Sequence, residues 1–166
     1  MPEPRPPIDA IRLRAWHRWS IYASTGLLVA TGLAWLALDF FARGRADIVG
    51  PHPLAHPLLA AHGAIAMIAT IAYGGVLASH VPRAWAVKRN RSTGCLIAAV
   101  LAVSIISAWL LYYASSEDVH ELASACHWIV GLSVALVLPF HVAMGRRARR
   151  LAERASRPAP IFFPTD

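Results

Sequence analysis

Charged residues are scarce in this sequence. Only 15% of its 166 residues are Asp, Glu, Lys or Arg, while 57% are hydrophobic, and the mean hydropathy is +0.48. A soluble domain usually carries about 25% charged residues, so the composition indicates a membrane protein. The remaining charge is unbalanced, because 16 Lys and Arg stand against only 9 Asp and Glu. The distribution of this charge along the chain is more informative than its total.

Cysteine is nearly absent, with Cys95 and Cys126 as its two examples. Each lies at one end of an apolar run, and the order of the runs places them on opposite membrane faces, which excludes a disulfide between them. The segment Ala123–Cys126, just before His127, lacks the first cysteine of a C-x-x-C-H attachment site. Covalently bound c-type haem is therefore not expected.

Charge is absent altogether from four long apolar runs: Ile21–Leu38, Leu58–Val81, Cys95–Ser116 and Leu122–Gly145. A helix that crosses the hydrocarbon core needs about 20 largely apolar residues, and its backbone groups must be paired within the segment. We therefore expect an all-α fold, a transmembrane four-helix bundle that forms one membrane domain over residues 1–166. The expected helices span about 17–41, 57–81, 94–116 and 120–145. The first run is long for a signal peptide and no clear cleavage site follows it, so we expect it to be retained.

Basic residues are nearly absent from two of the three loops between these helices. Apart from Arg43 and Arg45, all Lys and Arg precede the first run, lie between the second and third, or follow the fourth. The positive-inside rule then puts both termini in the cytoplasm. The third loop, Glu117–Glu121, is short, so the last two helices are expected to be antiparallel neighbours. The Pro-rich Met1–Pro7 and a cytoplasmic tail from about 150 to 166 are expected to be flexible.

Histidine is common for a membrane sequence, with eight examples, several of them inside apolar runs. Ionisable residues there are rare and usually functional. His127 and His141 are 14 residues apart, so at about 100° and 1.5 Å per residue they share a helix face and lie roughly 21 Å apart along it. His62 lies at the outer level of His127, and His17, at the start of the first helix, lies near the level of His141. This suggests two pairs, His62–His127 outside and His17–His141 inside.

Pairs of histidines are what a haem requires. Its iron takes one axial ligand on each porphyrin face, and neutral imidazole is a common choice. Nearby glycines, namely Gly63, Gly131 and Gly145, would leave room for a planar group, although glycine is also frequent at ordinary membrane helix contacts. The pattern predicts two non-covalent b haems, with the iron ligands His17, His62, His127 and His141.

His80 leaves the inner pairing open. It follows His62 by 18 residues, five turns, so it shares that face of the second helix at the cytoplasmic level. It could replace His17 as the partner of His141, contact a quinone or a haem propionate, or have a purely structural role. The other histidines, His52, His56 and His120, are expected in outer loops and solvated.

These residues resemble the bacterial four-helix di-haem cytochrome b group. That group includes bacterial cytochrome b561 and the cytochrome b subunits of formate dehydrogenases and thiosulfate reductase-like complexes. The resemblance covers about His17 to Gly145 and is carried by the Trp16–Trp19 segment around His17, by His62-Gly63, and by the pair His127 and His141. In the group, the helix 1 histidine pairs with the later helix 4 histidine, and the helix 2 histidine pairs with the earlier one.

The resemblance implies a function as well as a fold. The protein would lie in the bacterial inner membrane and pass electrons between a membrane quinone and a second redox partner, alone, as a homodimer or as an oxidoreductase subunit. It would have no bond-making chemistry of its own. A quinone site would lie at the cytoplasmic end, near Trp16, Trp19, His80, Arg83 and Trp85. Basic residues there, near Arg18, Arg83 and Arg146, would pair with haem propionates or meet anionic lipid.

Two haem-free alternatives stay open. The bundle could anchor a partner complex, or its histidines could form a proton or metal relay through His62, His80, His127 and His141. The four short helices offer no inverted repeat and no broken helix, which argues against a transporter. A pure anchor would leave the matched depths of the histidines as a coincidence.

Overall fold

The computed structural model of this chain describes residues 13–43, 52–88 and 90–155. These residues form four helices, α1 (Ala15–Arg43), α2 (Ala55–Ala86), α3 (Arg91–Tyr113) and α4 (Glu117–Ala155), and contain no strand. All four helices are long and apolar enough to cross a membrane. The expected all-α four-helix bundle is confirmed, and the chain is a multi-pass membrane protein.

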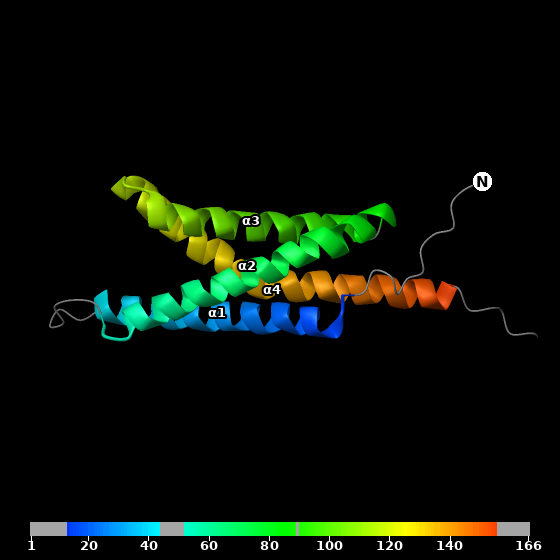
Figure 1. Cartoon of the computed structure of the whole chain (residues 1–166), viewed down its shortest axis with the longest axis horizontal. Helices are drawn as coiled ribbons and strands as arrows, with labels where there is room; N and C mark the ends of the chain where they lie inside the picture. The colour runs from blue at the N-terminus through cyan, green and yellow to red at the C-terminus, as the bar shows by residue number, and fades with distance from the viewer. Residues whose placement is uncertain (1–12, 44–51, 89, 156–166) are drawn as a thin grey trace, which may run out of the picture.

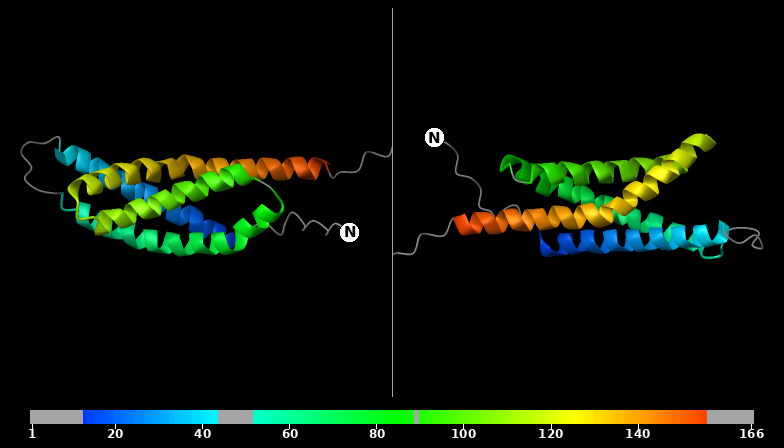
Figure 2. Two further views of the ribbon diagram at one scale, coloured as in Figure 1. Left: turned by 90° about the horizontal axis from the view of Figure 1, so that it is seen from above. Right: turned by 180° about the vertical axis from the view of Figure 1, so that it is seen from behind.

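The bundle consists of two helix hairpins. α1 packs along α2, and α3 packs along α4, whereas the contacts that join the hairpins, mainly α1 with α4, are few. Figures 1 and 2 show the start of α1, the α2–α3 turn and the end of α4 at the same end of the bundle. We call this the basic end, because most of the described Arg and Lys residues lie there. The other end, with the start of α2 and the α3–α4 connection, is the opposite end.

A tight turn at the basic end joins the two hairpins. Lys88 and Asn90 adopt positive φ angles of 55° and 53°, and Asn tolerates this left-handed conformation better than most residues. The Asn90 side chain donates a hydrogen bond from Nδ2 to the His141 carbonyl over 3.2 Å. Arg91 donates to the Trp85 carbonyl over 2.6 Å and lies 4.5 Å above the Trp85 ring centre. Side-chain bonds therefore hold the turn against both α2 and α4.

The last helix is longer than the sequence suggested. Glu117–Glu121, expected as a loop, forms the first turn of α4, and residues 114–116 make the connection instead. Acidic Glu117 and Asp118 in this turn complement the positive end of the helix dipole. The helix also continues to Ala155, through residues expected in the flexible tail, and an Arg149–Glu153 ion pair of 3.3 Å, one turn apart, supports this extension.

Three expected irregular segments lie outside the described residues. They are Met1–Pro7, most of the loop between the first two helices (residues 44–51), and residues 156–166.

α4 changes direction along its length. In the right-hand view of Figure 2, its yellow first half runs at an angle to its orange second half. Pro139 lies inside the helix; it cannot donate to the carbonyl of Ala135 and its ring crowds that carbonyl, which bends a helix one turn earlier. In Figure 1 the first half runs from the end of α3 toward α1, and the second half continues beside α1.

Few side chains in the described structure are buried. The apolar ones are Ile21, Ala69, Ile97, Ala123 and Val134, and the polar ones are Ser24, Thr25 and Ser107. Small residues at these positions let helix backbones approach closely, as is common in membrane bundles. Most large apolar side chains point outward, where lipid surrounds them. The interior is therefore held by close backbone contacts and polar bonds rather than by a large apolar core.

Candidate functional site

His62 of α2 and His127 of α4 face each other across the two hairpins. Their ring centres are 6.2 Å apart and their ring planes are inclined by 81°. Two imidazoles that bind one metal from opposite sides, each through a bond of about 2 Å, have ring centres about 6 Å apart. The separation therefore fits a shared metal, and the structure brings the predicted outer pair together.

The tautomer of His62 is set by α1. Its Nδ1 lies 2.8 Å from the Thr31 hydroxyl oxygen, and that hydroxyl also lies 2.8 Å from the Leu27 carbonyl. A carbonyl only accepts, so the single hydroxyl proton goes to Leu27, and His62 Nδ1 must be the donor toward Thr31. The Nε2 atom of His62 is then left with a free lone pair.

The tautomer of His127 is set by α3 in the same way. Its Nδ1 lies 3.1 Å from the Ser104 carbonyl, which can only accept. It also lies 3.1 Å from the buried Ser107 hydroxyl, which donates its own proton to Ser104 over 3.1 Å. Nδ1 therefore carries the hydrogen, and Nε2 again keeps the lone pair. Metal-binding histidines show this arrangement, with the second ring nitrogen donating to a nearby oxygen.

His141 is positioned by the start of α3. Its Nδ1 lies 2.9 Å from the Thr93 hydroxyl oxygen and 3.4 Å from the Asn90 amide nitrogen Nδ2. Thr93 also lies 3.4 Å from the Asn90 carbonyl, to which it can donate. Gly94 lies beside the ring, since a Cβ there would be 3.8 Å from His141 Cε1. In the part of the chain that the structure describes, the hydrogen bonds of His62, His127 and His141 thus all use Nδ1.

His17 is held differently. Its Nε2 lies 2.8 Å from the Ala72 carbonyl and therefore carries the hydrogen. Trp16 stacks on the ring, with centres 4.9 Å apart and planes 13° from parallel. A Cβ on Gly75 would lie only 2.8 Å from His17 Cε1. The Nε2 edge of the ring thus lies against its own hairpin partner, and Nε2 is occupied by a backbone bond.

The depth of His17 still matches the inner level. It contacts α2 at Ala72 and Gly75, about 15–20 Å beyond His62 along the helix, which compares with roughly 21 Å between the two α4 histidines. His80, one to two turns further along α2, is close enough to His141 to interact with it electrostatically. The structure therefore places both candidates near the inner level, with His80 within electrostatic range of His141 and His17 turned toward α2. The inner pairing stays open.

The remaining predicted residues lie apart from these histidines. His56 and His120 are exposed in the first turns of α2 and α4 rather than in loops, and His52 accepts a hydrogen bond from the Leu54 amide over 3.1 Å. The aromatic residues proposed for a quinone site, Trp16, Trp19 and Trp85, are exposed at the basic end. Arg83 is exposed in the last turn of α2. The free cysteines Cys95 and Cys126 lie toward opposite ends of the bundle, in α3 and α4.

The glycines chosen from the sequence are not the ones that meet the histidines. A Cβ on Gly131 would meet nothing within 4 Å, and one on Gly63 would face the Tyr112 hydroxyl at 3.4 Å. One on Gly145 would lie 3.7 Å from Asn90 Nδ2. The glycines beside histidine rings are instead on the neighbouring helix of each hairpin, namely Gly32, Gly75 and Gly94. Spacing along one helix could not reveal contacts that form between helices.

Sequence reasoning also missed the hydroxyl residues that orient the rings, Thr31, Thr93 and Ser107. Isolated Ser and Thr residues in or next to the apolar runs were the available signal. Such residues are common in membrane helices, where they often bond only their own backbone, as Thr70 does with the Ala66 carbonyl over 2.8 Å. The signal therefore could not separate the orienting hydroxyls from the others.

Among residues 13–43, 52–88 and 90–155, no three His, Cys, Asp or Glu side chains come together to hold a bare metal ion. A haem asks less of the protein, since the iron takes only its axial ligands from side chains. The described residues bring histidines together in pairs, as His62 and His127 are. No protein-family model, no curated protein and no solved structure matches the chain.

Proposed function

We propose that this protein is a b-type cytochrome that passes electrons across the membrane between the quinone pool and a redox partner, through two non-covalent haems. The observation that supports this best is the outer pair. His62 and His127 come from different hairpins, their ring centres are 6.2 Å apart, and both rings bond through Nδ1. Each ring therefore keeps an unprotonated Nε2, the atom that would bind a haem iron.

The donor set suits haem better than a bare ion. Two neutral imidazoles are a common axial pair for haem iron, while zinc and similar ions in proteins take three or four side-chain ligands. A haem held between two histidines exchanges one electron and has no open position for a substrate. The chain's own contribution is to hold the rings, fix their tautomers and surround them with apolar helices.

The hydroxyls behind the rings have a defined role in this proposal. A hydrogen bond from the far ring nitrogen to an oxygen makes Nε2 more basic and fixes the ring plane. Thr31 does this for His62, and Ser107 and the Ser104 carbonyl do it for His127. Thr93 contacts Nδ1 of His141 and holds that ring in place. All these partners belong to the same hairpin as the ring. Each hairpin would thus present ready-made ligands to the other.

At the inner level, His141 would be one ligand of the second haem. The family resemblance favours His17 as its partner, and the matching depth of His17 agrees with this choice. The ring would then have to leave the Ala72 carbonyl. His80 is the alternative, since it already lies near His141. The partner not used as a ligand would contact a haem propionate or a quinone.

The proposal extends to location and partners on the strength of the resemblance. The protein would lie in the bacterial inner membrane with its basic end in the cytoplasm, in line with the positive-inside rule. A quinone would bind at that end, near Trp16, Trp19, His80, Arg83 and Trp85. The second electron partner would be a redox protein or oxidoreductase subunits, and the chain could act as a homodimer.

A visible spectrum of the purified protein tests the proposal. We expect sharp bands after dithionite reduction and a haem-to-protein ratio near two, measured on protein made in haem-replete cells. A colourless, iron-free preparation would refute the haem proposal. It would leave the two haem-free alternatives, a membrane anchor or a proton or metal relay through the same histidines.

A further inference from the structure

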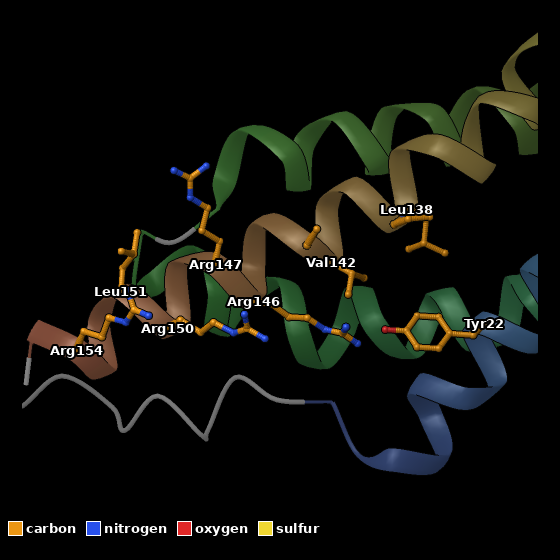
Figure 3. A pocket seen from close by; sticks show the side chains of 10 residues that line it. Tyr22, Leu138, Val142, Arg146, Arg147, Arg150, Leu151 and Arg154 are labelled. Carbon is orange, nitrogen blue, oxygen red and sulfur yellow. The ribbon is translucent and has the colours of Figure 1, made fainter.

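A second feature of the molecule lies on α4, at the basic end. A groove of about 780 Å³ opens between this helix and α1, and residues of both helices line it. The side chains that matter here are Tyr22, Leu138, Val142, Arg146, Arg150 and Arg154. Figure 3 shows the three arginines following one another along the side of α4 near Tyr22, with Arg146 extended toward the Tyr22 ring.

The groove is distinct from the histidine levels. At about 100° per residue, Arg150 lies nine residues, or about 180°, round the helix from His141. His141 itself points toward α3, where Thr93 holds it. The arginine row therefore lies on the side of α4 away from His141, and no histidine lines the groove.

The walls of the groove combine positive charge with an apolar floor. Arg146, Arg150 and Arg154 repeat every four residues, so their guanidinium groups form a row. The only described carboxylate on this part of α4 is Glu153, which forms an ion pair with Arg149, a residue that does not line the groove. Just inside the row, Leu138 and Val142 give an apolar surface at the depth of the membrane. Charge and apolar surface thus follow each other along one groove.

We propose that this groove binds one anionic phospholipid from the leaflet at the basic end. Guanidinium groups match phosphate oxygens in charge and geometry, and basic pockets at helix ends are known to take anionic headgroups. The phosphate would lie among Arg146, Arg150 and the Tyr22 hydroxyl. One acyl chain would then follow Leu138 and Val142 into the membrane. A phospholipid satisfies both the charged row and the apolar floor, which a free phosphate would not.

Lipid titration followed by native mass spectrometry tests this proposal on the purified full-length protein in neutral detergent. We expect phosphatidylglycerol to bind more tightly than phosphatidylcholine. Replacing one groove arginine with Gln should lower phosphatidylglycerol affinity about fivefold, and the double Arg146→Gln/Arg150→Gln variant should lower it about 30-fold. If the double variant does not fold, as judged by its helical circular dichroism, the two single variants carry the test.

Arg149→Gln is the matched control, because it removes the same charge from the same helix outside the groove. We expect it to change phosphatidylglycerol affinity less than about twofold. If Arg149→Gln lowered phosphatidylglycerol affinity as much as the groove variants do, the effect would be one of general charge, and the proposed lipid site would be wrong. Equal binding of the two lipids by the wild type would also refute the site, and so would competition by inorganic phosphate at the concentrations at which phosphatidylglycerol binds.

This inference does not depend on haem. A colourless protein that binds phosphatidylglycerol through Arg146 and Arg150 would refute the proposed function and support the lipid site. A haem-loaded protein with no lipid preference would do the reverse.

Discussion

The outer and inner histidine levels are built from the same residue type but are held differently. At the outer level, His62 and His127 face each other, and each bonds an oxygen of its hairpin partner through Nδ1. At the inner level, Nδ1 of His141 lies beside the Thr93 hydroxyl and the Asn90 amide, and His17 bonds the Ala72 carbonyl through Nε2. The difference shows that the oxygen behind a ring, as much as the histidine itself, decides whether a metal-binding nitrogen is available.

The cause lies in where each ring meets the neighbouring helix. His62 meets α1 at a threonine that bonds its Nδ1 and at Gly32, whose missing side chain leaves space beside the ring. His17 meets α2 at Gly75, and this close approach lets the far edge of its ring reach the Ala72 carbonyl. Helix carbonyls keep a second lone pair that can accept such a bond. Both outer rings thus keep an unprotonated Nε2, whereas Nε2 of His17 at the inner level is occupied by a backbone bond.

Removal of an outer ligand should give the largest effect. We expect His127→Ala or His62→Ala to lower the haem-to-protein ratio from near two to near one, because one axial nitrogen is lost. Haem extraction and protein determination on the same sample measure this ratio. His120→Ala, on the same helix as His127 but exposed in its first turn, is the control and should keep both haems. Full haem content in His127→Ala would show that the outer pair is misassigned.

The inner level can be resolved by comparing its two candidates. We expect His17→Ala to reduce the ratio to near one, as His141→Ala should, while His80→Ala keeps both haems and changes only the spectrum of the inner one. The same haem determination decides the matter. The reverse result, with haem lost in His80→Ala and kept in His17→Ala, would assign His80 as the ligand and leave His17 as a structural contact.

Gly75→Ala tests the position of His17 at the inner level without replacing any histidine. The new Cβ would lie 2.8 Å from His17 Cε1, so the ring must move away from its position on α2. If His17 is a ligand, we expect inner-haem affinity to change by about 10-fold or more, as for other residues that orient metal ligands, with the outer haem unchanged. Haem titration of the apoprotein measures the two sites.

Gly74→Ala is the control for this change, since a Cβ there would meet no atom within 4 Å. It should leave haem binding unaltered. Equal effects of Gly74→Ala and Gly75→Ala would mean that the helix, and not the His17 contact, is responsible.

The smallest effect is expected from a change at Thr31, whose hydroxyl bonds the proposed outer ligand His62. Thr31→Val keeps the shape of the side chain but removes the acceptor for His62 Nδ1. The ring then donates less electron density to the iron, which favours the reduced form. We expect the outer-haem midpoint potential to rise by on the order of 30 mV, where 59 mV corresponds to a tenfold change for one electron. A spectroscopic redox titration would measure it.

Thr70→Val is the control for the threonine change. Thr70 bonds only the Ala66 carbonyl in the described structure and is exposed, so its loss should leave both potentials within error of the wild type. A fall in the Thr31→Val potential, or no change at all, would contradict the role given to this hydrogen bond.

Much of the fold could be predicted from the sequence. The four charge-free runs predicted the four helices. The distribution of arginine predicted that the start of α1 and the end of α4 lie at the same end of the bundle, as they do. The boundaries were less secure, because Glu117–Glu121 reads as a polar loop while its acidic residues also stabilise a helix start. The bend near Pro139 was not anticipated, although it brings the second half of α4 toward α1 and so shapes the groove there.

The sequence alone determined how residues of the same helix lie relative to one another, in depth and in the face that they share. The depth and face of His127 and His141 follow from a fixed rise and rotation per residue, and these need no knowledge of neighbours. The tertiary structure decided the relations between helices: that His62 meets His127, that Thr31 and Ser107 stand behind them, and that His17 turns to Ala72. Such contacts depend on how two helix surfaces interdigitate, and a side chain's position along one helix does not fix that.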